Sequence, residues 1–327
     1  MPGGGGCRLM ASRQPKHGAP QETHRLCSVV SRTSNFFDER LSPLPCCLAG
    51  AIFSSIVCCR FIRPGLLPSR LPPIIHGMIN DLRVHLLPSL FDSEEVRDDV
   101  VVILDILRAS TTITHALAAG AKSVIPVSEV PEALTKASQF SPGSVLLGGE
   151  RDGLHIEGFD LDNNPLAYTP DLVTNKTIIF TTTNGTRALL RSILAETIVI
   201  GSFVNLSAVV RLLEKEDRPV HLVCAGTRGK ITLEDTLCAG AIADGLIQAR
   251  LWRESDITDD QTWLARNTWK QVSQSEESLR TAMFASFGGR NCHRLGFDEQ
   301  IERAVTRDLF NFVPVFDAET GCITAPR

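Results

Sequence analysis

The sequence predicts an α/β protein with three layers, α/β/α, around a central sheet that is mainly parallel or else mixed. From about Met78 onward, short apolar runs alternate with segments of helical period. This alternation is typical of right-handed crossovers between parallel strands. Several of the runs, such as Val100–Leu104, are apolar at every position, as expected for strands that are covered on both faces.

Each expected element has a local reason. Strands are expected where β-branched and other apolar residues cluster. Gly120 ends the helix that is expected at residues 110–119. We expect strands at residues 82–87, 100–104, 122–127, 145–147, 177–180, 197–200, 220–223 and 312–316. Helices are expected at residues 110–119, 129–140, 186–194, 233–250, 258–272, 276–287 and 298–306. No helix or strand is assigned to the stretch GGRNCHRLGF between the last two helices, and the Trp residues are expected to pack on helix faces.

The first 77 residues differ from the rest of the chain. They contain a run of four glycines, scattered Arg and Pro, and six of the ten cysteines. Their apolar stretch CCLAGAIFSSIVCC is too short for a membrane span. We expect residues 1–77 to be an extension, either disordered or translated from upstream of the natural start, and residues 78–327 to form one folded domain. A targeting or anchoring role for the extension stays open.

Composition gives no reason to expect nucleic acid or a membrane as partner. The chain has 327 residues, 43% of them hydrophobic, and a net charge of −4, which is typical of a globular protein with no large basic surface. The four cysteines beyond residue 77 have no paired spacing, as expected in a reducing cytoplasm. Any site for an anion must therefore be local; whether the chain forms a homo-oligomer stays open.

Three polar loops follow the expected strands: DILRAS, TTTNGTRA and CAGTRGKITLED. In parallel sheets ligands bind beyond the carboxyl ends of the strands, so we expect these loops to lie on one side. Arginine forks suit phosphate, carboxylate and sulfonate, and free N–H groups at helix starts attract anions. The substrate-binding candidates are Arg108, Arg151, Thr183, Asn184, Gly185, Thr186, Arg187 and Arg228. A plain Asn-Gly turn is the alternative for the central loop.

Carboxylates occur in two of these loops and in the loop after residues 145–147, which also carries Arg151. Asp105, Glu150, Glu234 and Asp235 are the acid–base or metal candidates, because mixed carboxylates beside phosphate ligands suit Mg²⁺. Asp105 and Glu234 are the expected metal ligands. A solvated helix start is the alternative for Glu234 and Asp235. No phosphate-binding GxxxxGK[ST] or GxGxxG motif is present, and His155 is the only histidine in a loop suited to acid–base work.

The chain from about Met78 resembles the 2-phosphosulfolactate phosphatase family. The resemblance rests on VVILDILRAST, GGERDGLHIEGFDLDNNP, TTTNGTRAL and CAGTRGKITLEDTLCAG, in that order. It implies a three-layer α/β/α fold and a cytoplasmic phosphoric monoester hydrolase that uses Mg²⁺ to remove phosphate from 2-phospho-3-sulfolactate, a step toward coenzyme M. Asp162, Asn164, Gln300 and Ala304 depart from the family pattern, which leaves the substrate open to a closely related acid.

Two other functions remain open at this point. One is a lyase or isomerase of phosphorylated acids that uses the same anion and metal site. The other is a non-catalytic protein that binds an anionic metabolite, because fold alone does not fix function. Only hydrolysis yields inorganic phosphate together with the free alcohol, so product analysis separates the three.

Overall fold

The structure is a computed structural model that describes residues 81–249, 254, 257 and 259–326. The chain divides into two compact units, Met1–Ser69 and Arg70–Arg327, and the account below concerns the second. The expected extension at residues 1–77 lies outside the described residues. Within those residues, no helix combines the length and the apolar character needed to cross a bilayer.

The sheet has two parallel halves. The first half contains β1 (Leu82–His85), β7 (Val220–Cys224), β2 (Val100–Leu104) and β6 (Thr197–Gly201), paired in that order. Every residue of β2 and β7 is buried, which confirms that the uninterrupted apolar runs are strands covered on both faces.

The second half contains three strands, each close to its expected position. They are β3 (Ser123–Val127), β5 (Thr177–Thr181) and β4 (Val145–Gly149), with β5 in the middle. All residues of β5 are buried. The loop TTTNGTRA therefore leaves the most enclosed strand of this half.

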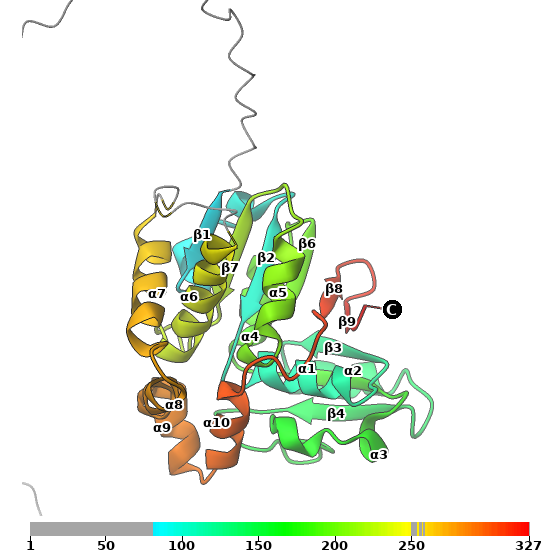
Figure 1. Ribbon diagram of the computed structural model, residues 1–327. Coiled ribbons are helices and arrows are strands. Elements are labelled where there is room, and N and C mark those ends of the chain that lie inside the picture. Colours follow the sequence, from blue (N-terminus) through cyan, green and yellow to red (C-terminus); the bar gives the residue numbers. More distant parts are fainter. Residues whose placement is uncertain (1–80, 250–253, 255–256, 258, 327) are drawn as a thin grey trace, which may run out of the picture. The chain divides into compact units, whose positions relative to one another are not determined.

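A short hairpin joins the halves. β8 (Val315–Asp317) pairs antiparallel with β6, and β9 (Cys322–Thr324) pairs antiparallel with both β8 and β3. Because these pairings are all antiparallel, the two halves run in opposite directions within one sheet of order β1-β7-β2-β6-β8-β9-β3-β5-β4. Figure 1 shows β2 and β6 running steeply while β3 and β4 lie across the view.

The expectation that the polar loops leave one edge of one parallel array is therefore wrong. The loops still meet, since residues after β2 and β7 line the same pocket as residues after β4 and β5. The carboxyl ends of the two halves face the pocket from different sides.

Helices cover the sheet in layers, which confirms the three-layer α/β/α prediction. α5 (Leu206–Leu213) and α6 (Leu233–Gln248) pack on one face of the first half. α1 (Ala109–Ala118) and α4 (Gly185–Arg191) share a second apolar core with residues from both halves. α2 (Val130–Ala137) covers the remaining face of the second half.

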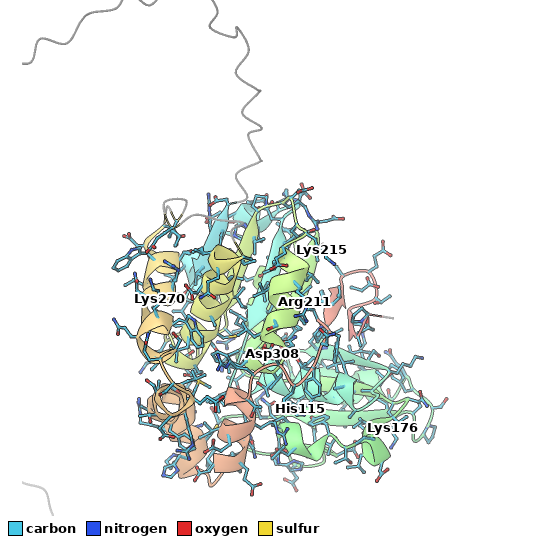
Figure 2. The ribbon with its side chains drawn as sticks, in the orientation of Figure 1. His115, Lys176, Arg211, Lys215, Lys270 and Asp308 are labelled. Carbon is cyan, nitrogen blue, oxygen red and sulfur yellow. The ribbon has the colours of Figure 1, made fainter. Side chains whose placement is uncertain are left out.

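α5 is amphipathic, whereas α6 is buried at most of its positions. Figure 2 shows charged side chains on the outside of the layers, and Arg211, Lys215 and Lys270 are exposed. The chain also forms short helices in its connections: η1 (Pro88–Leu90), η2 (Ser93–Val96), η3 (Pro165–Ala167), α3 (Pro170–Val173) and η4 (Phe203–Asn205).

Four helices follow α6: α7 (Asp260–Val272), α8 (Glu276–Ala285), α9 (Phe287–Arg294) and α10 (Asp298–Val305). Most of the stretch GGRNCHRLGF, where the sequence predicted no helix, is α9. Ser286 caps this helix by accepting a hydrogen bond from the backbone N–H of Gly289. A side chain at 289 would meet the carbonyl oxygen of Met283 at 1.9 Å, so close packing, not a break, requires glycine there. Trp269 packs in the core as predicted, whereas Trp263 is exposed.

Candidate active site

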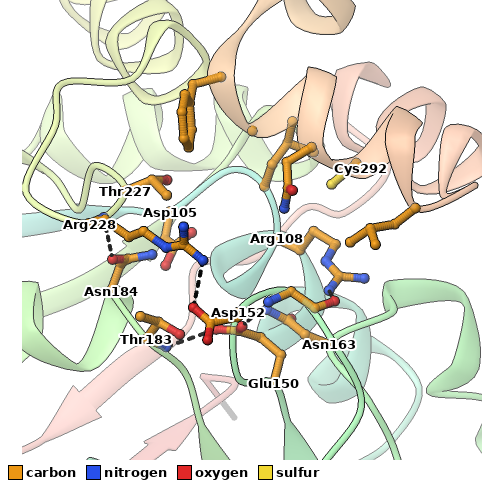
Figure 3. A pocket seen from close by; sticks show the side chains of 16 residues that line it. Asp105, Arg108, Glu150, Asp152, Asn163, Thr183, Asn184, Thr227, Arg228 and Cys292 are labelled. Carbon is orange, nitrogen blue, oxygen red and sulfur yellow. Dashed lines mark hydrogen bonds and ion pairs between the residues drawn. The ribbon is translucent and has the colours of Figure 1, made fainter. Parts of the chain in front are cut away.

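A pocket lies where the loops after β2, β4, β5 and β7 meet α9 (Figure 3). It brings together six of the residues predicted for the site. The lining residues are Asp105, Leu107, Arg108, Glu150, Asp152, Gly153, Asn163, Thr183, Asn184, Thr227, Arg228, Phe287, Gly288, Asn291, Cys292 and Leu295.

Asp105 follows β2 directly and is buried at the floor of this pocket. Its carboxyl accepts hydrogen bonds from the backbone N–H groups of Ala109 and Gly185, at the first residues of α1 and α4. Burial, and then the nearby charges of Glu150 and Glu234, raise the pKa of Asp105 to about 7. The N–H groups expected to hold an external anion thus hold this side chain. A Cβ at position 185 would lie 2.9 Å from Asp105 Oδ2, which explains the glycine.

Glu150 connects the ends of β4 and β5. Its Oε2 accepts from the N–H of Gly153 at 2.6 Å, and its Oε1 accepts from the N–H of Thr183 at 2.8 Å. Two backbone donors fix the carboxylate against the pocket wall. The Thr183 hydroxyl oxygen is buried and has no partner among the described residues, so it is available to a ligand.

Glu234 and Asp235 lie in the first turn of α6 and are both almost fully buried. The alternative of a solvated helix start is therefore wrong. Asp235 accepts hydrogen bonds from Ile106 N–H (2.8 Å), Gly226 N–H (3.0 Å) and the Thr232 hydroxyl (2.9 Å). It ties the loop after β2 to the loop after β7, behind the pocket lining. Burial is the main cause that raises the pKa of Asp235 well above its ordinary value.

Glu234 contacts the beginning of α9. Its Oε1 accepts from the N–H of Gly288 at 3.1 Å, while its Oε2 is buried with no hydrogen-bond partner among the described residues. Burial raises the pKa of Glu234. An unpartnered buried carboxylate oxygen is costly, which points to a proton or a cation at this position.

Arg108 is the buried cation of the pocket, with 4% of its surface exposed. Its Nη1 donates to Gln300 Oε1 at 2.5 Å and its Nη2 donates to the carbonyl oxygen of Gly153 at 2.8 Å. The guanidinium also lies over the Phe297 ring, 4.8 Å from the centroid. Among the described residues, no carboxylate oxygen comes within ion-pair distance of it.

Arg228 reaches the mouth of the pocket from the loop after β7. It has a positive φ of 52°, and its N–H donates to Asn184 Oδ1 at 3.0 Å. Its Nη2 forms an exposed ion pair with Asp152 Oδ1 at 2.7 Å, drawn as a dashed line in Figure 3. Asp152 was missed as a site residue, although it stands next to Arg151 in the quoted motif.

Two predicted arginines do not line the pocket. Arg151 donates to the carbonyl oxygens of Ser128 (2.5 Å) and Glu150 (3.0 Å) and to the Thr181 hydroxyl (2.9 Å), so it braces the ends of the second half. Arg187 is the third residue of α4, and its side chain is exposed.

The remaining predicted residues lie just outside the pocket. Gly185 and Thr186 are in the first turn of α4, beneath Asp105, where they line a small separate cavity. The Thr186 hydroxyl donates to the Val127 carbonyl oxygen. His155 is exposed and is not part of the lining.

Sequence reasoning missed Asn163, Gln300 and the residues of α9. Asn163 is 3% exposed, and its side-chain Oδ1 has no partner among the described residues. It stands inside the motif GFDLDNNP, which was a usable signal. Asn291 and Cys292 were missed because no helix was predicted at their positions. Burial raises the pKa of Cys292 to about 11, so its thiol is not an activated nucleophile.

The donor set fits a hard divalent cation. Within residues 81–249 and 259–326, no three Asp, Glu, His or Cys side chains form a ready-made metal cage. Mg²⁺ does not need one, because it binds one or two carboxylates and keeps waters or phosphate oxygens. The charge of Glu234 contributes to the raised pKa of Asp105. Glu234 itself does not line the pocket, but its Oε2 is buried without a partner among the described residues.

Comparison with known proteins places the chain. Residues 85–319 match the family described as 2-phosphosulpholactate phosphatase. The chain belongs to this family. Its membership confirms the resemblance predicted from the sequence and the enzyme class that it implied, the phosphoric monoester hydrolases.

Three relatives illustrate the similarity, and each is named probable 2-phosphosulfolactate phosphatase. The protein from Caldanaerobacter subterraneus subsp. tengcongensis is 41% identical over 68% of this chain and 90% of its own length. The one from Caldicellulosiruptor saccharolyticus is 38% identical over 68% of this chain and 93% of its own length. The one from Thermotoga petrophila is 41% identical over 65% of this chain and 87% of its own length.

Proposed function

We propose that the protein is a Mg²⁺-dependent phosphatase that hydrolyses 2-phospho-3-sulfolactate, or a closely related small phosphorylated acid, to the free alcohol and inorganic phosphate. The reaction belongs to the kind of route that leads to coenzyme M, and the cytoplasm is its proposed location. The names of the relatives support the substrate, and the electrostatics of the pocket support its charge.

The observation that carries the proposal is the buried guanidinium of Arg108. A buried charge without an opposite charge is costly, on the order of several kcal/mol. Its contacts from Gln300, Gly153 and Phe297 are all neutral, so they orient the group without cancelling its charge. An anionic group of the substrate is therefore the missing partner. Because Arg108 is buried, the electrostatic attraction between its guanidinium and that anion is stronger than it would be in water.

Other pocket residues suit the rest of a polyanion. Phosphosulfolactate carries phosphate, carboxylate and sulfonate on adjacent carbons, so it offers more than one anion to bind. Among the described residues, the Thr183 hydroxyl oxygen has no hydrogen-bond partner. Arg228 reaches the mouth of the pocket, and solvent screens its exposed ion pair with Asp152. With Arg108, these residues give two cations and one hydroxyl donor for one small ligand.

Asp105 is suited to handling protons near neutral pH, because its pKa is about 7. In the free pocket a proton on Asp105 relieves its repulsion with Glu150 and Glu234. Asp105 and Glu234 are the residues that would hold Mg²⁺, which when bound supplies Lewis-acid stabilisation of the transferring phosphoryl group. Glu150 accepts hydrogen bonds from the N–H groups of Gly153 and Thr183 and so holds the loops after β4 and β5 together.

The test is phosphate release from 2-phospho-3-sulfolactate by the full chain, with MgCl₂ or with EDTA. We expect release with MgCl₂ only, and Arg108→Gln should lower kcat/KM about 30-fold or more, as expected for loss of a buried charge contact. Arg280→Gln is the matched control, since Arg280 is an exposed arginine paired with Glu302 outside the pocket. Absent release, or release that neither EDTA nor Arg108→Gln reduces, would contradict the proposal. A new carbon–carbon double bond or a phosphorylated isomer would indicate a lyase or isomerase instead.

A further inference from the structure

We propose that Gln300 is the specificity-determining residue of the Arg108 subsite, because it fixes the guanidinium with a neutral amide and so reserves its charge for an ionised oxyanion of the ligand. The inference rests on the proposed function where turnover is concerned. Anion binding at the subsite can be tested without it.

The beginning of α10 provides the support for Arg108. Gln300 accepts a hydrogen bond from Arg108 Nη1, and Phe297, the residue before the helix, lies under the guanidinium plane. Gln300 itself is 5% exposed, and its neighbour Ile301 is fully buried in the main core. The amide oxygen therefore has little freedom, and it positions Arg108 from a rigid element.

The Gln300 amide is neutral, and this matters because it lies beside the buried guanidinium of Arg108. A carboxylate in the same place would form a buried ion pair with Arg108, and a ligand anion would then meet a compensated site. An amide oxygen accepts the same hydrogen bond but carries no net charge. Gly153 contributes only a carbonyl oxygen on the other side.

The acidic side chains near the pocket do not take over this role. Both oxygens of Glu150 accept backbone N–H groups, and Asp152 pairs with Arg228. The charge of Arg108 thus stays directed at the pocket. A neutral group such as an alcohol or an ester gains little from it, whereas a sulfonate, phosphate or carboxylate gains the full interaction.

Gln300→Glu is the direct test, because it changes the charge and almost nothing of the shape. The probe is inorganic sulfate, titrated calorimetrically into the full chain at pH 8 in EDTA. We expect sulfate to bind the unchanged protein and to bind Gln300→Glu at least tenfold more weakly. The same variant should raise KM for 2-phospho-3-sulfolactate at least tenfold and leave kcat within about threefold.

Two further variants separate charge from packing. Gln300→Met keeps the length and the neutrality but removes the acceptor, so sulfate binding should fall only a few-fold while kcat falls more than in Gln300→Glu. Gln271→Glu adds the same charge at an exposed position on α7 and should leave both constants unchanged.

Unchanged sulfate affinity in Gln300→Glu would overturn the inference. So would a loss in Gln300→Met as large as the loss in Arg108→Gln, and this second result can be read even if Gln300→Glu does not fold. If sulfate binding follows Gln300 while no variant and no unchanged protein releases phosphate, the subsite stands and the proposed phosphatase function fails. If phosphate is released but sulfate binding does not depend on Gln300, the proposed phosphatase function stands and the inference about the subsite fails.

Discussion

Replacing Asp105 by asparagine should change stability in opposite directions at acidic and at neutral pH. The carboxyl is fully enclosed, and its pKa in the folded chain is about 7 against an ordinary value of 3.8. Because the pKa of Asp105 is higher in the folded chain, this carboxyl loses its proton at a lower pH in the unfolded chain than in the folded one. The stability contributed by protonated Asp105 is therefore present at low pH and is lost as the pH rises from about 4 to about 7.

The size of the effect follows from this difference in proton affinity. Each tenfold change corresponds to about 1.4 kcal/mol, so the ionised carboxylate costs about 4 kcal/mol above pH 7. Asparagine avoids that cost but leaves one of the N–H donors, from Ala109 or Gly185, without an acceptor, at about 1–2 kcal/mol. We expect Asp105→Asn to be less stable than the unchanged protein by about 1–2 kcal/mol at pH 4 and more stable by about 2–3 kcal/mol at pH 8.

The assay is urea unfolding of both proteins from pH 4 to pH 8, with EDTA present so that no divalent cation neutralises the carboxylates. Groups that titrate equally in both proteins cancel in the comparison. Phosphate release should be abolished in the variant, so gained stability and lost activity coincide. A stability difference that stays constant across this pH range would show that Asp105 ionises normally and would refute the reasoning.

Three further predictions address the surroundings of the pocket. Asp235→Ala leaves three buried donors without an acceptor and should lower the free energy of unfolding in urea by about 3 kcal/mol. Gly288→Ala places a methyl group 2.2 Å from Glu234 Oε1, so it should displace that side chain and lower kcat at least tenfold while the melting temperature changes little. Asp152→Asn frees Arg228 from an exposed pair and should lower KM about two- to fivefold at low salt, with the gain shrinking in 1 M NaCl.

Each of these predictions has a clear opposite result. A normal unfolding curve for Asp235→Ala would mean that water replaces the carboxyl between the two loops. Full activity in Gly288→Ala would remove Glu234 from the reaction. A raised KM in Asp152→Asn would show that Asp152 holds Arg228 in its binding position and does not compete with the ligand.

The strands of the two halves were predicted well from the sequence, because each is an apolar run long enough to stand apart from the polar residues around it. The hairpin was only partly predicted. β8 and β9 have three residues each, and the opposite directions of the two halves follow from pairings between residues far apart in the chain. Nothing local in the sequence specifies those pairings.

The site was predicted where a residue directly follows a strand, as Asp105 and Glu150 do. It was missed where packing reverses a local signal: Gly288 and Gly289 resemble a helix break but allow α9 to approach Glu234 and Met283. The arginines show the same limit. Arg108 and Arg187 have similar sequence contexts, yet one is buried under α10 and the other points outward from α4, and only the tertiary arrangement separates them.

The hairpin that bridges the sheet has a consequence for how the protein is made. β8 and β9 follow all other strands in the chain, so they leave the ribosome after both parallel halves have been synthesised. Until they emerge, β6 and β3 each present an unpaired edge, and such edges attract other strands. We therefore expect a nascent chain stalled before residue 315 to bind chaperones or to aggregate, although it already carries every residue that lines the pocket.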